Sequence, residues 1–192
     1  MTRSGGERAS QTVKEKIIDA SVRCIVRNGA ADTSLAAIAE ASDVSKALLH
    51  YHFTDREHLL AAVATSLGTR IVQREHVAMS AAQGSTIDVL WSVLEHELRI
   101  GEVRALLTLS LSREAAVATA AHKAAQARRH AAAATVRLLY ERLGLVTRVS
   151  EAIIADAYAA FVDGLALTAV GAEANARVSH DVFWLAMLSL GE

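Results

Sequence analysis

Residues 33–60 of the 192-residue chain are TSLAAIAEASDVSKALLHYHFTDREHLL. Ser34 and Ser45 are residue types whose side chains accept hydrogen bonds from the free amides at the start of a helix. They predict one short helix over residues 35–41 and a second that Ser45 opens and that runs to about residue 52. Two short helices joined by a turn of three to four residues are typical of a helix-turn-helix unit.

The second of these helices is expected to have a buried and an exposed face. Helical spacing predicts that five apolar residues pack inside the unit, namely Ile38, Ala39, Val44, Leu49 and Phe53. Lys46, Ala47 and His50 then face outward, and Tyr51 and His52 lie at the helix end. Lysine, hydroxyl and imidazole groups are suited to contacts with phosphates or base edges. A capped helical hairpin whose aromatic residues only pack is the alternative.

The rest of the chain is also expected to be helical. Hydrophobic residues make up 52% of the sequence, proline is absent, and alanine, the best helix former, is abundant. Apolar residues at helical spacing begin at Val13, and Asn28-Gly29 ends that pattern. Six further helices are expected over residues 54–79, 86–99, 103–112, 113–143, 150–170 and 174–190, with Gly171 separating the last two. The prediction is an all-α chain of about nine helices without strands.

Composition and charge exclude several classes of protein. The hydrophobic content excludes a disordered chain, and the lack of proline excludes collagen-like sequences. The single cysteine, Cys24, falls on an apolar helix face and cannot form an internal disulfide, so a cytoplasmic location is expected. The polar residues 1–12 lack the apolar core of a signal peptide, and no window of about 18 uncharged apolar residues occurs, so no membrane partner is expected.

No pattern of residues predicts catalysis. His50 and His52 are two positions apart on a helix and cannot share a face. His96-Glu97 lacks the second histidine of a zinc protease motif. We therefore expect a protein that is not an enzyme and that holds no metal or other cofactor.

Residues 17–63 resemble the N-terminal domain of the tetracycline-repressor-like (TetR) family. The similarity rests on five motifs, Asn28-Gly29, Thr33-Ser34-Leu35-x-x-Ile38-Ala39, Val44-Ser45-Lys46, Leu49-x-Tyr51-His52-Phe53 and Arg56-Glu57-x-Leu59-Leu60. The resemblance implies an N-terminal three-helix helix-turn-helix DNA-binding domain over residues 13–56, after a flexible arm over residues 1–12. A C-terminal helical domain for ligand binding and dimerisation would then cover residues 57–192. The implied function is a ligand-responsive transcriptional regulator, a repressor released from a palindromic operator by an effector.

The resemblance also implies which residues contact DNA. In the family, the positions of Lys46, Ala47 and Leu48 face base edges, and those of Tyr51 and His52 hold phosphates. The expected contacts are Thr33, Ser34, Ala36, Ser45, Lys46, Ala47, Leu48, His50, Tyr51, His52 and Arg56.

Three departures from the family pattern alter these expectations. Asp43 occupies a turn position usually filled by glycine, so it must accept a left-handed or strained backbone, which aspartate tolerates better than most residues. Ala47-Leu48 replaces the usual Gly-Thr, and His50 replaces a tyrosine. These changes leave Lys46 as the main hydrogen-bonding contact to bases.

The N-terminal part carries little net positive charge. Residues 1–56 contain eight lysines or arginines and seven acidic residues, so their net charge is +1. Arg3 and Arg8 of the arm are possible extra DNA contacts. DNA binding is therefore expected to depend only modestly on salt concentration.

The C-terminal half contains two further candidate sites. A cavity is expected to be lined by Trp91, Leu94, Glu95, Leu98, Leu107, Leu111, His122, Gln126, His130, Tyr140, Tyr158, Phe161 and Val162. Because this lining has few fixed charges, a small apolar or aromatic effector is expected. The last two helices carry more apolar surface than one core can cover, which predicts a homodimer. Its expected interface contains Ala160, Gly164, Leu167, Val178, Asp181, Trp184, Leu185 and Leu188.

Two functions remain open at this stage. The first is the regulator, with double-stranded operator DNA, a small-molecule effector and a second copy of the chain as partners. The second is a helical small-molecule carrier or interaction protein that uses the same C-terminal cavity without binding DNA. For each single lining residue, ordinary core packing is the competing interpretation.

Overall fold

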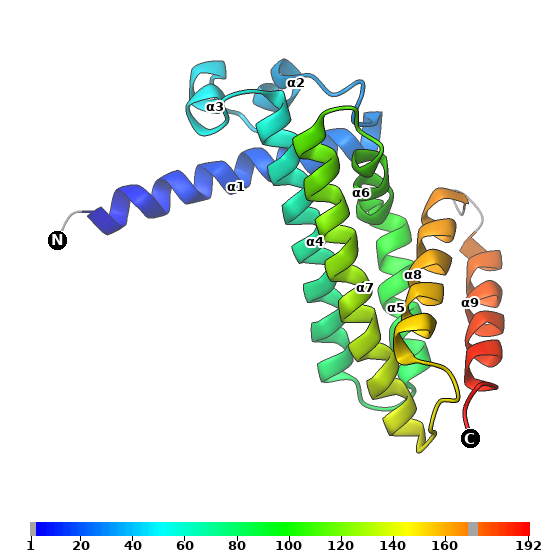
Figure 1. Cartoon of the computed structure of the whole chain (residues 1–192). Coiled ribbons are helices and arrows are strands. Elements are labelled where there is room, and N and C mark those ends of the chain that lie inside the picture. The colour runs from blue at the N-terminus through cyan, green and yellow to red at the C-terminus, as the bar shows by residue number, and fades with distance from the viewer. Residues whose placement is uncertain (1–2, 169–172) are drawn as a thin grey trace. The chain divides into compact units, whose positions relative to one another are not determined.

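The computed structural model describes residues 3–168 and 173–192. These residues form nine α-helices and no strand, which confirms the predicted all-α fold (Figure 1). The helices are α1 (Arg3–Asn28), α2 (Leu35–Ala41), α3 (Lys46–His52), α4 (Arg56–Ala81), α5 (Thr86–Ile100), α6 (Glu102–Ser110), α7 (Ala115–Leu143), α8 (Glu151–Thr168) and α9 (Glu173–Leu188). The predicted break at Gly171 lies outside the described residues.

The chain forms two compact units. The first contains the chain up to Leu67 together with Ala105–His122, and the second contains Gly68–Arg104 together with Lys123–Glu192. Helices α4, α6 and α7 therefore each contribute to both units. This differs from the boundary after residue 56 that the sequence suggested. The physical reason is that α4 continues from Arg56 to Ala81 without interruption, so side-chain packing and not a helix end sets the division.

The first unit is built around the short helices that the serines begin. Ser34 Oγ accepts a hydrogen bond from the Ala37 amide, and Ser45 Oγ accepts one from the Leu48 amide, each at 3.1 Å. Asp43 has a φ of 50°, so this turn has the left-handed backbone expected for that position. Both predicted caps and the predicted turn are confirmed.

The core of the first unit is formed by apolar residues from α1 to α4 and from α6. The largest of its buried side chains are Ile17, Ile38, Leu49, Phe53, Leu59, Leu60, Leu67, Leu106 and Leu109. Four of the five predicted core residues around the turn are buried, whereas Val44 is half-buried. Cys24 is a buried free thiol, in agreement with its predicted core position. Leu49 and Phe53 thereby hold one face of α3 against the unit.

The first helix begins earlier than the sequence suggested. Residues 1–12 were expected to form a flexible arm, but α1 extends back to Arg3. The segment lacks proline and contains the good helix formers Glu7, Arg8, Ala9 and Gln11. The helix that begins at Val13 in the sequence pattern therefore continues toward the amino terminus, and Gly5 and Gly6 weaken this extension without ending it. Met1 and Thr2 lie outside the described residues.

The second unit packs α5 against α8 and α9, which lie side by side (Figure 1). An aromatic cluster joins these helices. The Trp184 ring lies 5.2 Å from the Tyr158 ring, and Phe161 stacks on Phe183 at 4.6 Å between ring centroids. The buried His180 ring accepts a hydrogen bond from Trp184 Nε1 at 3.1 Å. The cluster therefore fixes α8 and α9 against each other within this unit.

Glycines end two helices as predicted. Gly101 closes α5 with a φ of 72°, and Gly144 follows α7 with a φ of 66°. Across residues 3–168 and 173–192, none of the helices combines the length and the apolar character needed to span a bilayer.

Candidate nucleic-acid interface and effector cavity

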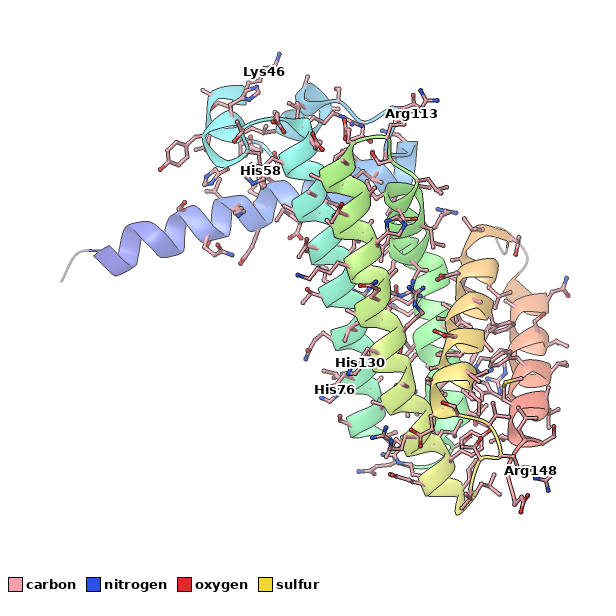
Figure 2. All side chains as sticks on the ribbon, viewed as in Figure 1. Lys46, His58, His76, Arg113, His130 and Arg148 are labelled. Atoms are coloured by element: carbon pink, nitrogen blue, oxygen red, sulfur yellow. The ribbon has the colours of Figure 1, made fainter. Side chains whose placement is uncertain are left out.

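The outward face of α3 is the candidate nucleic-acid interface. Lys46, Ala47, Leu48 and His50 are exposed, whereas Leu49 between them is buried. Tyr51 is 78% exposed although it is a large aromatic residue. Figure 2 shows the Lys46 side chain pointing away from the helices of its unit. The expected contact residues of α3 therefore share one accessible surface, which we call the α3 face (residues 46–48 and 50–52).

The α3 face carries groups able to bind a polyanion and to contact bases. The Lys46 ammonium supplies three hydrogen-bond donors, and the Tyr51 hydroxyl can donate to a phosphate. The His52 ring is half-buried and packs edge-on against the Tyr51 ring at 5.2 Å between centroids. Ala47 and Leu48 offer apolar contact of the kind that suits a thymine methyl group. The face can thus combine phosphate and base contacts.

Residues near α2 extend this surface, with one exception. Ser34 and Ala36 are exposed. Thr33, by contrast, is 1% exposed, and its hydroxyl donates to the Gly29 carbonyl oxygen at 2.7 Å. Its expected role as a DNA contact is therefore not supported, because the hydroxyl closes the loop after α1 and has little access to solvent.

Arg56 is also occupied within its own unit. Its guanidinium donates to the backbone oxygens of Ala30 and Thr33, and it forms an ion pair with Glu114 at 2.9 Å. Arg56 was expected to contact DNA, but these bonds use the side chain to connect the α1–α2 loop with the segment before α7. We assign Arg56 a structural role.

Arg3 and Arg8 were named as possible extra DNA contacts. Their side chains lie outside those that the structure describes.

The second unit encloses a cavity of about 30 Å³. Its lining consists of Ile71, Glu75, Val93, Leu94, Glu97, Val103, Arg128, Ala132, Tyr158, Ala159 and Val162. Leu94, Tyr158 and Val162 were predicted to line it. This volume holds about one or two water molecules, so an organic effector would have to move side chains to enter.

Most of the other predicted lining residues lie elsewhere. Trp91, Glu95 and Leu98 border a separate surface depression on α5. Leu111 is 83% exposed, and His122, Gln126 and His130 are exposed on α7, where Figure 2 marks His130. Tyr140 donates its hydroxyl to the Met187 carbonyl oxygen, Phe161 stacks on Phe183, and Leu107 belongs to the first unit. Leu107, Leu111 and His122 belong to the first unit, whereas the others lie on helix faces that turn away from the cavity.

The cavity is more highly charged than expected. Glu75, Glu97 and Arg128 contribute to its lining, so the expectation of few fixed charges is wrong. Glu97 is 4% exposed, and its Oε1 accepts a hydrogen bond from Arg74. Arg74 also donates to Glu102. Arg128, itself buried, donates to Asp163 at 2.9 Å.

The environment of Glu75 and Tyr158 favours their neutral forms. Burial raises the pKa of the Glu75 carboxyl, and the hydrogen bond from Thr135 at 2.6 Å and the charge of Arg128 only partly oppose this. Burial, together with the negative charge of Glu75, raises the pKa of Tyr158 well above its ordinary value. Tyr158 therefore presents an uncharged hydroxyl at neutral pH.

The exposed surfaces of α8 and α9 form the candidate dimer face. Leu167 on α8 and Val178, Val182 and Leu185 on α9 are exposed, with Leu185 at 70%. Ala160 and Gly164 are exposed on α8, and a Cβ added to Gly164 would meet no atom within 4 Å. Leu188 is half-buried. These residues repeat at helical spacing, as an interhelical contact requires.

Two residues expected in that interface have other partners. Trp184 is 1% exposed and packs in the aromatic cluster, so it offers little surface to a second copy of the chain. Asp181 is half-buried and pairs with Arg177 at 3.0 Å. The neighbouring Val182, which was not among the expected interface residues, is exposed instead. It falls one turn from Val178, a spacing that could have identified it.

Comparisons with known proteins agree with this geometry. Residues 17–63 match the family model of the bacterial regulatory proteins, tetR family. The chain is 31% identical over 90 residues to the HTH-type transcriptional regulator TtgR of Pseudomonas putida, a match that covers 47% of this chain and 41% of TtgR. It is 28% identical over 98 residues to the regulator AcrR of Shigella flexneri, covering 51% and 45%. The chain thus matches less than half the length of these curated relatives.

Solved structures resemble the chain over nearly its whole length. A TetR transcription regulator from Haloarcula marismortui superimposes with a TM-score of 0.75 at 19% identity, covering 95% of this chain and all of that one. NemR of Escherichia coli, in its reduced form, gives a TM-score of 0.74 at 14% identity, covering 94% and 97%. At these identities the comparison concerns the fold. The chain is therefore similar to the tetR family of bacterial regulatory proteins over residues 17–63, and its fold resembles that of the solved regulators over nearly its whole length.

Proposed function

We propose that the protein is a DNA-binding transcriptional regulator that acts as a homodimer and whose operator affinity is changed by a small molecule. The observation that carries this proposal is the α3 face, where Lys46 and Tyr51 project from a capped helix whose opposite side is anchored by Leu49. Helices that present polar residues in this way enter the major groove. The match of residues 17–63 to the family model and the names of the relatives support the same interpretation.

A gel-shift assay against the DNA that flanks its own gene tests this function. Lys46→Ala is expected to weaken specific binding by about ten-fold or more, because a good base contact contributes roughly 1–3 kcal/mol of discrimination. Tyr51→Phe, which removes only the hydroxyl, is expected to weaken binding less and equally for all sequences. Lys123→Ala on α7, an exposed lysine outside the α3 face, is the charge-matched control.

The carrier without DNA binding makes the opposite prediction. Such a protein would show no preference for any duplex, and Lys46→Ala would change nothing. The salt dependence gives a second criterion, since a net charge of +1 over residues 1–56 limits the number of neutralised phosphates. A log–log slope near −9, which corresponds to about ten phosphates, would contradict the proposed mode of binding.

The dimer is proposed to form through the exposed faces of α8 and α9. Leu167, Val178, Val182 and Leu185 would pack against the same residues of a second copy, which makes the interface isologous. Ala160 and Gly164 would allow the helices to approach closely. Two helix pairs then form a four-helix bundle that presents two α3 faces to a palindrome. Leu185→Glu is expected to shift sedimentation from dimer to monomer, and an unchanged dimer would refute this interface.

The regulatory step is proposed to link the cavity with operator binding. Helix α4 supplies Ile71 and Glu75 to the cavity, and its earlier residues Leu59 and Leu60 to the core beside α3. A ligand lowers operator affinity only if it binds one arrangement of the protein more tightly than the other. Repression relieved by ligand is the family's common mode. A ligand that binds the free protein but leaves the gel shift unchanged would contradict this step.

A further inference from the structure

The cavity of the second unit contains a buried carboxylate oxygen without a partner. Glu97 Oε1 is held by Arg74, but Glu97 Oε2 is buried and has no hydrogen-bond partner. An unsatisfied buried acceptor loses its hydration without replacement, and for a charged group that cost is high. A hydrogen-bond donor placed in the cavity would remove this cost.

Glu75 supplies a second acceptor to the same cavity. Its Oε1 accepts a hydrogen bond from Thr135, and none of the ion pairs among the described residues involves its carboxylate. Glu75 comes from α4, whereas Glu97 comes from α5, and both line the same cavity. Two carboxylates from different helices thus converge on one small space.

The arginines near this space are neutralised by other carboxylates. Arg128 pairs with Asp163 at 2.9 Å, and Arg74 pairs with both Glu97 and Glu102. Arg70 Nη1 lies 3.8 Å from Glu102. Three guanidiniums therefore face four carboxylates when Glu75 is included. The group is neutral while Glu75 is protonated and carries one negative charge once Glu75 ionises, so a cation in the cavity would favour the ionised form of Glu75, and an anion would oppose it.

We propose that this cavity binds a small organic monocation, with its ammonium group between Glu75 and Glu97 Oε2 and its hydrocarbon part against the apolar lining. This inference rests on the proposed function, since it names the chemical class of the effector. Ile71, Leu94 and Val162 supply the apolar contact. The space of about 30 Å³ suits a charged group of the size of an ammonium, and the hydrocarbon chain has to displace side chains.

Three probes of equal chain length and different charge test the proposal. They are n-hexylammonium, 1-hexanol and hexanoate, each titrated at neutral pH into the full-length protein without DNA and followed by calorimetry. The ammonium is expected to bind at least about ten-fold more tightly than the alcohol, because it adds charge-assisted hydrogen bonds to two carboxylates. Hexanoate is expected to bind most weakly.

Variants then locate the binding site. Glu75→Gln and Glu97→Gln are each expected to reduce the preference for the ammonium over the alcohol by about ten-fold, while the affinity for the alcohol stays the same and shows that the cavity is intact. Glu95→Gln is the matched control, because Glu95 is an exposed carboxylate on the same helix as Glu97 and lies outside the cavity. It is expected to leave all three affinities unchanged.

Several results would overturn the inference. These are equal binding of ammonium and alcohol, no binding of any probe up to its solubility limit, or a preference for the ammonium that survives both cavity substitutions. Loss of the preference in Glu95→Gln would place the cation at the surface depression.

The assay contains no DNA, so it separates the proposed regulator function from the proposed cation binding. Cation binding without a specific gel shift would refute the regulator alone, and a specific gel shift without cation binding would refute this inference alone.

Discussion

The contact between α4 and α7 at Gly68 predicts the outcome of adding a single methyl group. A Cβ built on Gly68 would lie 2.4 Å from the Cβ of Ala124 and 3.1 Å from its Cα. Carbon atoms are most favourably placed about 3.5–4.0 Å apart. In Gly68→Ala the two helices must therefore separate by more than a side-chain adjustment allows, because Ala124 has no rotatable side chain and its backbone is also in contact.

The expected loss follows from two opposing contributions. Replacing glycine by alanine inside a helix favours folding by about 1 kcal/mol. Overpacking costs typically about 1–3 kcal/mol, and a clash that involves backbone belongs at the upper end of that range. The difference is a loss of about 2 kcal/mol in the free energy of unfolding. For a chain of this length, that corresponds to a decrease in Tm of roughly 4–8 °C.

Urea and thermal unfolding at one fixed protein concentration measure this change, since dimer stability depends on concentration. The matched control is the double variant Gly68→Ala/Ala124→Gly, which moves the methyl group from one helix to the other. It is expected to recover part of the stability that Gly68→Ala loses, so the two substitutions are not additive. A Gly68→Ala protein that is more stable than the parent, or strictly additive effects in the double variant, would refute the close approach.

Three further predictions concern single side chains. Burial lowers the pKa of His180 in the folded protein, so His180 of the unfolded chain takes up a proton at a higher pH than His180 of the folded protein. The stability that neutral His180 contributes above about pH 6.5 is therefore lost as the pH falls toward the folded pKa. Urea unfolding at several pH values measures this loss, and His180→Gln should remove that part of the pH dependence. Ser45→Ala removes the cap of α3 and is expected to lower unfolding stability by about 1 kcal/mol, whereas an unchanged midpoint would argue against the cap. Arg56→Gln loses the ion pair with Glu114 and is expected to lower Tm. The salt slope of DNA binding is expected to stay unchanged in this variant. A slope whose magnitude falls by about one would show that Arg56 contacts a phosphate instead.

The helix boundaries that the sequence identified correctly depend on local chemistry. Ser34 and Ser45 cap α2 and α3, and Gly101 ends α5, because each acts on neighbours within a few residues. The α3 face was also accessible from the sequence, since burial of Leu49 and exposure of Lys46 follow from helical spacing alone. Such features need no knowledge of which helices pack together.

The effector cavity depends on tertiary packing, which local spacing does not determine. Its lining comes from α4, α5, α6, α7 and α8, and a rotation of a helix by one position replaces a lining residue by an exposed one. On α7, the sequence suggested His130, whereas Arg128 two residues earlier faces the cavity. Selecting residues by polarity without the helix phase led to the exposed histidine.

A charged residue at an apolar position was the available signal for the cavity. On α5, Glu97 follows Leu90 and Leu94 at the spacing that continues their buried face. On α7, Arg128 occupies the same stripe as the buried Ala124 and Ala132. Because an isolated buried charge is costly, a carboxylate on one apolar face and a guanidinium on another predict compensating partners nearby. The structure provides such partners for Arg128 and for one oxygen of Glu97, and the remaining oxygen is the position at which a cationic ligand would complete the arrangement.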